Sequence, residues 1–147
     1  MKRVIVALAV AGLLGGGSWT VSAASPESEI SGTWVAVSAE REGKADGELN
    51  GNRLTFTGNT FVIERDGKMI YKGTFKTDSM QKPARIDFRH TAGGAKGKKW
   101  RGIYALDGDS LQIADNAPDM TKPRPTELAA KAGSGHIKIN FRRAAPR

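Results

Sequence analysis

Residues 53–77 read RLTFTGNTFVIERDGKMIYKGTFKT, and no other part of the chain says more about its fold. Apolar and polar side chains alternate along this stretch, which is typical of β-strands that bury one face. Gly58-Asn59 and Asp66-Gly67 divide it, and both dipeptides favour tight hairpin turns because their residues tolerate positive φ. We therefore predict three consecutive antiparallel strands, over residues 53–57, 60–65 and 68–77.

Five further runs with similar alternation flank this stretch, and they cover residues 32–40, 85–91, 100–106, 110–114 and 136–143. Gly73 is expected to mark a bulge or bend in its own strand, where the alternation is irregular. Residues 45–51 and 126–131 are each expected to form a single helical turn. Most connections are short, so the eight strands are expected to meander and to close into a small antiparallel up-and-down β-barrel without exposed edges. A two-sheet β-sandwich is the alternative.

The N-terminus has the composition of an export signal. Lys2 and Arg3 precede an apolar run over residues 4–14, and small residues follow it. This run is shorter than the ~20 residues that span a bilayer, so we expect a cleaved signal peptide, no later transmembrane segment, and a periplasmic or extracellular protein. The expected organisation is a signal peptide over 1–24, a linker over 25–31, a barrel domain over 32–143 and a tail over 144–147.

The chain has 147 residues, no cysteine and a formal net charge of +8. Without cysteine it has no disulfide, thiolate nucleophile or thiolate metal site, so a hydrophobic core must hold the domain together. The positive charge favours solubility and weak attraction to anionic surfaces, and nucleic acid is not an expected partner of an exported protein. Basic residues gather at Lys96, Lys98, Lys99 and Arg101, which are candidate contacts to anionic polysaccharide or phosphate groups. Solvated loop charges are the alternative.

Several short motifs follow one another in a fixed order along the predicted domain. Gly32-Thr33-Trp34 comes first, and Gly73-Thr74-Phe75, the run GIYALDGDSL over 102–111, Arg124-Pro125-Thr126-Glu127 and Gly133-Ser134-Gly135-His136 follow. Together they resemble an uncharacterised lipocalin-like domain family that is expanded in Planctomycetes, and the early Gly-x-Trp resembles lipocalins and related calycin barrels. The resemblance implies a secreted or envelope-associated β-barrel. It does not imply a known ligand or reaction.

The same resemblance implies a structural role for Trp34. In lipocalin-like barrels the equivalent tryptophan plugs the closed end, and a basic residue near the exit of the last strand packs over it. The inward phase of Ile137, Ile139 and Phe141 continues to Arg143. We therefore expect a cation–π stack of Arg143 on Trp34, with a solvated end charge as the alternative.

No catalytic or metal-binding set is readable in the sequence. Ser134 lacks the nucleophile-elbow motif, and the acidic residues fall mostly in predicted turns or on outward phases, so an enzyme is not expected. His90 and His136 lack metal-ligand spacing. Asp107-Gly108-Asp109 is explained by turn chemistry rather than by calcium. We accordingly expect neither a metal nor a cofactor.

The predicted interior is bulky, with inward positions at Trp34, Leu54, Phe56, Phe61, Ile63, Ile86, Phe88, Ile103, Leu111, Ile113, Ile137, Ile139 and Phe141. A barrel filled in this way leaves room for a shallow pocket at its open mouth, where Tyr71, His90 and Tyr104 are candidate contacts. The first hypothesis is a monomeric barrel that binds a small apolar or amphipathic molecule there. The alternative is a non-enzymatic envelope module, structural or interacting, whose basic surface contacts anionic polymers or protein partners.

Overall fold

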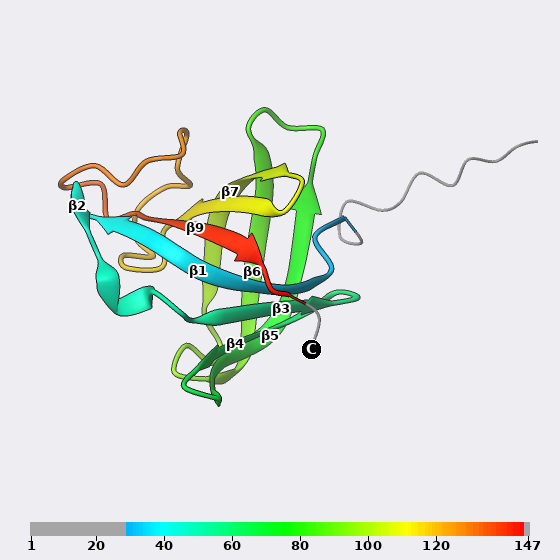
Figure 1. Ribbon diagram of the computed structural model, residues 1–147. Coiled ribbons are helices and arrows are strands. Elements are labelled where there is room, and N and C mark those ends of the chain that lie inside the picture. Colours follow the sequence, from blue (N-terminus) through cyan, green and yellow to red (C-terminus); the bar gives the residue numbers. More distant parts are fainter. Residues whose placement is uncertain (1–28, 146–147) are drawn as a thin grey trace, which may run out of the picture.

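The computed structural model describes residues 29–145 and forms one continuous antiparallel sheet that closes on itself (Figure 1). The elements are β1 (Gly32–Arg41), β2 (Lys44–Ala45), the 3-10 helix η1 (Gly47–Leu49), β3 (Arg53–Thr57), β4 (Thr60–Arg65), β5 (Lys68–Asp78), β6 (Ala84–Gly93), β7 (Lys99–Asp107), β8 (Ser110–Asp115) and β9 (Ile137–Arg143). Each strand pairs with the next along the chain, except that β2 pairs only with β1, and β1 also pairs with β9. Eight strands therefore close into a barrel that β2 extends, which confirms the predicted barrel over the sandwich.

The strand positions predicted from alternation are confirmed to within two residues at each end, and β3 and β4 begin and end as predicted. Residues 45–51 contain η1, but residues 126–131 do not form the expected helical turn. There the Ala129 N–H donates to the carbonyl of Glu127, two residues earlier in the chain, so the turn is tighter than a helical turn. Among residues 29–145 no helix is long and apolar enough to cross a lipid bilayer. The expected signal peptide lies outside the described residues.

Two bulges interrupt the pairing of β5 with its neighbours. The β4–β5 register shifts between Ile63 and Glu64, and the β5–β6 register shifts between Lys72 and Gly73. A Cβ atom on Gly73 would overlap the carbonyl oxygen of Arg89 on the neighbouring strand. Only glycine allows the two backbones to approach here. A bulge does lie beside Gly73, but its extra residue is Thr91 of β6 rather than a residue of the strand that carries Gly73.

Large apolar side chains fill the barrel interior. The ring centroids of Phe56 and Phe75 lie 4.6 Å apart, and the next aromatic pair, Phe61 and Phe88, lies edge to face at 4.9 Å. The inward phases predicted from sequence are confirmed except in β7. Ile103 is 1% exposed, but it pairs with the exposed Arg85 and stands outside the main core cluster, whereas its neighbour Tyr104 belongs to that cluster. Position 102 faces inward like Tyr104, but it is a glycine. The sequence therefore shows no apolar side chain there that would indicate the inward phase of β7.

Trp34 closes one end of the barrel. It is fully buried, and its indole N–H donates to the carbonyl oxygen of Ile30 at 2.9 Å. The guanidinium carbon of Arg143 lies 4.3 Å from the indole centroid, so the expected stack is present. Arg143 also donates to the Ser31 carbonyl at 3.0 Å, and its Nε lies 3.2 Å from Oδ1 of Asp109. Ile30 is fully buried too, so the core begins within the segment 25–31 that was expected to be a linker.

The Trp34→Ala substitution should lower the free energy of unfolding by roughly 3–5 kcal/mol, because it leaves a large cavity in the closed end. Urea denaturation followed by circular dichroism measures this loss. The control is Val37→Ala on the same strand, where an exposed side chain should change stability by less than about 0.5 kcal/mol. A loss below about 1 kcal/mol for Trp34→Ala would show that the plug is not needed.

Candidate functional site

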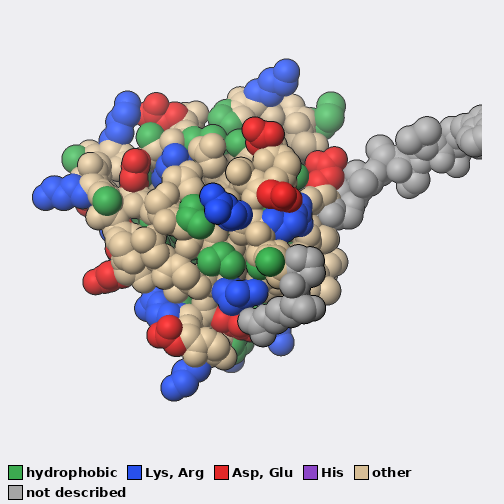
Figure 2. All heavy atoms as spheres, in the orientation of Figure 1, with side chains coloured by type: hydrophobic (Ala, Val, Ile, Leu, Met, Phe, Trp, Pro, Cys, Tyr) green, Lys and Arg blue, Asp and Glu red, His purple; other side chains and the backbone are tan. Residues whose placement is uncertain are grey.

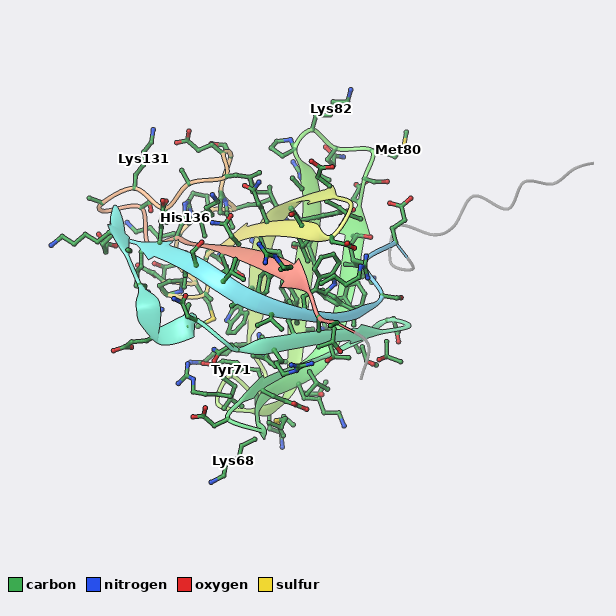
Figure 3. The ribbon with its side chains drawn as sticks, in the orientation of Figure 1. Lys68, Tyr71, Met80, Lys82, Lys131 and His136 are labelled. Carbon is green, nitrogen blue, oxygen red and sulfur yellow. The ribbon has the colours of Figure 1, made fainter. Side chains whose placement is uncertain are left out.

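A cavity of about 110 Å³ lies at the barrel end opposite Trp34. Its wall is mainly apolar and includes Leu54, Ile63, Ile139 and Phe141. Tyr71 and Trp100 add aromatic surface, and the polar lining residues are Arg41, Asn52, Arg53 and Asp115. Figure 3 labels Tyr71 near the same end of the molecule as Lys68 of the β4–β5 hairpin, and away from Met80 and Lys82 of the β5–β6 connection.

Asp115 is the one carboxylate among the described residues that line this cavity. It continues the inward phase of Leu111 and Ile113 to the last position of β8, and only 5% of the residue is exposed. Its partner on β7 is Gly102, where an added Cβ would lie 2.9 Å from the Asp115 Cβ. The missing side chain at position 102 therefore leaves the space that the buried carboxyl occupies.

Burial raises the pKa of the Asp115 carboxyl to about 7. Two weaker influences oppose this rise: the Ala117 N–H, which donates to Oδ1 at 2.9 Å, and the positive charge of Arg41. Arg41 and Asp115 both pair with Ile137, from either side of β9, so the two charged residues flank one strand at the mouth. The Nε of Arg41 lies 3.4 Å from Oδ2 of Asp46, so its charge is shared with a second carboxylate.

Aromatic rings form the opposite part of the site. The centroid of Trp100 lies 4.9 Å from that of Tyr71 and 4.0 Å from that of His90. His90 is 2% exposed and does not line the cavity, and neither ring nitrogen has a hydrogen-bond partner among residues 29–145. Burial lowers the pKa of His90 to about 4, so its ring is neutral at pH 7.

The three residues predicted at the mouth are thus only partly brought together. Tyr71 lines the cavity, and His90 lies behind it with their centroids 5.5 Å apart. Tyr104 lies further along β7, toward the end closed by Trp34, where it is buried in the core and pairs with Ala84 and Ile113. Tyr104 is therefore a core residue rather than a mouth contact.

The four predicted anion contacts are also divided. Lys96 and Lys98 lie in the β6–β7 hairpin loop, whereas Lys99 and Arg101 lie on β7 and line a separate surface groove. The second histidine, His136, lies with its Nε2 atom 2.8 Å from the carbonyl oxygen of Pro123. Within residues 29–145 no three His, Cys, Asp or Glu side chains gather closely enough to hold a metal ion.

The long connection between β8 and β9 is held against the barrel beside the site. Nη1 of Arg124 donates to Oδ1 of Asp87 at 2.6 Å and to the Gly102 carbonyl at 2.7 Å. Oδ1 of Asn116 accepts the Arg101 N–H at 2.9 Å, and its Nδ2 donates to the Lys122 carbonyl at 2.9 Å. These bonds hold the backbone that follows Asp115 in place and so help to position its carboxyl.

Asp115 was not among the residues predicted from sequence, because the strand was expected to end at Ala114 and the acidic residues were expected to face outward. The signal that identifies it is the phase of Leu111 and Ile113. Extending that phase by one more step places an acidic side chain inside the barrel.

Comparisons of the chain with protein-family models, with curated proteins and with solved structures found no match. The resemblance to a lipocalin-like family therefore stays a prediction. The fold and the site rest on the geometry alone.

The raised pKa of Asp115 should make stability depend on pH. The folded state binds the Asp115 proton more tightly than the unfolded chain, so stability is lost as the pH rises from about 4 to about 7. The Asp115→Asn variant removes this loss. Over that range its stability should therefore improve by a few kcal/mol relative to the unsubstituted protein, since each pKa unit corresponds to about 1.4 kcal/mol.

Urea denaturation at several pH values measures this difference. Asp107→Asn, on the exposed end of β7, is the control for removing a carboxylate elsewhere. If the curves for Asp115→Asn and the unsubstituted protein stay parallel between pH 4 and pH 7, the pKa of Asp115 is not raised.

Proposed function

We propose that this protein binds a small amphipathic molecule at the open end of its barrel. The observation that supports the proposal is an apolar cavity with a single buried carboxyl, Asp115, at its polar side. Small-molecule sites typically combine an apolar lining with a few placed polar groups. We also propose, from the N-terminal composition, that binding takes place outside the cytoplasm.

The size of the cavity limits what part of the ligand it takes. A dry cavity of about 150 Å³ holds one benzene ring, and this cavity measures about 110 Å³. Phe56, Phe61 and Phe88 occupy the space further inside the barrel. The cavity therefore suits the end of an alkyl chain or a small ring, with the remainder of the ligand outside the mouth.

Asp115 indicates the polar group of that ligand. A buried carboxylate favours a hydrogen-bond donor, because an N–H or O–H group replaces the hydration that burial removed. The charge of Arg41 is already shared with Asp46, although Arg53 is a second basic lining residue. Tyr71 and Trp100 also line the cavity, and aromatic rings can bind a cation. An amine or alcohol fits this arrangement better than a carboxylate does.

We propose binding rather than catalysis. The described lining residues offer one carboxyl and no imidazole or thiol, and His90 lies behind the aromatic rings. General acid–base chemistry generally needs a second positioned group within hydrogen-bond reach of the reacting atoms.

Titration with hexylamine, hexanol and hexanoate tests the proposal, since these probes share one chain and differ in the head group. Hexylamine and hexanol should bind saturably and more tightly than hexanoate, as measured by NMR chemical-shift changes at the cavity residues. The Ile63→Trp substitution, which places a larger side chain in the cavity, should weaken their binding at least tenfold. The control is Val37→Trp, which adds the same ring at an exposed position of β1.

The proposal would be contradicted if none of the three probes binds saturably to the unsubstituted protein, provided that circular dichroism shows the protein to be folded. Equal weakening by Ile63→Trp and Val37→Trp would also contradict it. If the probes bind as expected, native mass spectrometry of protein purified from its own host, before and after solvent extraction, would identify the natural ligand by its mass.

A further inference from the structure

A second hollow lies on the outer face of the barrel, over β5, β6 and β7. It has a volume of about 450 Å³, and its charged or polar lining residues are Thr74, Lys76, Asp87, Arg89, Lys99 and Arg101. We call it the basic groove. It shares no lining residue with the mouth cavity, so an inference drawn from it is independent of the proposed function.

Strand pairing places like charges side by side in the basic groove. Arg89 pairs directly with Lys99 across β6 and β7, and with Thr74 across β5 and β6. Like charges directly opposite each other on one face of a sheet are destabilising. Folding alone therefore gives no reason for this pair, whereas an anion bound between the two side chains would.

The charge of the groove is also not neutralised from within. Asp87, its single acidic lining residue, already forms an ion pair with Arg124 at 2.6 Å. Asp87 lies opposite Lys76 and Arg101 in the strand register, but among residues 29–145 none of the four basic side chains of the groove forms an ion pair. By contrast, on the face shown in Figure 2, basic and acidic side chains are interspersed.

The arrangement suits a chain of anionic groups better than a single ion. The basic residues come from three adjacent strands, and neighbouring strands lie about 4.8 Å apart, so one small anion cannot contact all of them. Thr74 and Asp87 lie among the cations and can bond hydroxyl groups. A ligand that carries both hydroxyls and repeated negative charges matches this mixture.

Two other polyanionic partners fit less well. Single-stranded nucleic acid is held by stacking on exposed aromatic rings, and the groove's two aromatic residues, Phe75 and Phe88, are 2% and 3% exposed and belong to the core. A membrane surface favours apolar side chains that insert beside the basic ones. The exposed large apolar residues Val37, Met69, Met80 and Met120 do not line the groove.

We propose that the basic groove binds an anionic polysaccharide. Acidic groups on successive sugar units contact Arg89 and Lys99 at the centre and Lys76 and Arg101 beside them. Sugar hydroxyls bond Thr74 and Asp87. The site is assembled by cross-strand pairing on the outside of a barrel whose inside serves another purpose.

Calorimetric titration of the full domain with an oligogalacturonate tests this proposal, with a neutral maltooligosaccharide of equal length as the reference. The oligogalacturonate should bind, the neutral sugar should not, and added salt should weaken binding. The Arg89→Gln/Lys99→Gln double variant should bind at least tenfold more weakly. The matched control is Lys96→Gln/Lys98→Gln, which removes the same charge from the adjacent hairpin loop and should change the affinity less than twofold.

The proposal would be overturned if neither oligogalacturonate nor a sulfated oligosaccharide binds, or if both double variants weaken binding equally. It would also be overturned if a single-stranded oligonucleotide, or an anionic vesicle, binds more tightly through the same residues. Equal weakening would mean attraction to net charge alone. Thermal unfolding checks that each variant is folded. If the Arg89→Gln/Lys99→Gln variant does not fold, the single variant Lys99→Gln replaces it and is expected to weaken binding about threefold or more.

Discussion

Backbone pairing between β1 and β9 is the constraint on which the rest of this protein depends. It joins the first long strand to the last, removes both sheet edges and encloses the aromatic core. One end of this seam pairs Trp34 with Arg143, and the other end pairs Arg41 with Ile137. The plug and the mouth are therefore at the two ends of one strand pair, and this pairing places Arg41 at the mouth.

The two ends differ in how they treat charge. At the closed end the guanidinium of Arg143 remains partly exposed and lies over an indole, with a carbonyl and a carboxylate as further partners. At the open end the carboxyl of Asp115 is buried with one backbone N–H as its hydrogen-bond donor. Burying a carboxylate in this way is costly. A fold that keeps such a group beside an apolar cavity has the features expected of a binding site.

The connection between β8 and β9 relates the mouth to the basic groove. Arg124 bonds both Asp87, which lines the groove, and the carbonyl of Gly102, which pairs with Asp115. Asn116 accepts a hydrogen bond from the backbone N–H of Arg101 on β7, the strand that also carries Gly102. One ordered segment thus supports two surfaces of different chemistry, an apolar one inside the barrel and a basic one outside it.

The sequence by itself determined the class of fold and the strands and turns. The stack of Arg143 on Trp34 was expected from the resemblance to lipocalin-like barrels, and the phase of the last strand selected Arg143. The strands and turns follow from alternation and from turn dipeptides, which are local properties of the chain. Only the tertiary structure decided that Asp115 is buried, that Ile103 is buried outside the main core cluster and that Tyr104 lies within it. It also decided that Lys99 and Arg101 join Lys76 and Arg89 rather than Lys96 and Lys98. Cross-strand neighbours depend on strand register and barrel closure. Both are set by contacts between residues far apart in the chain, so local sequence patterns do not predict them.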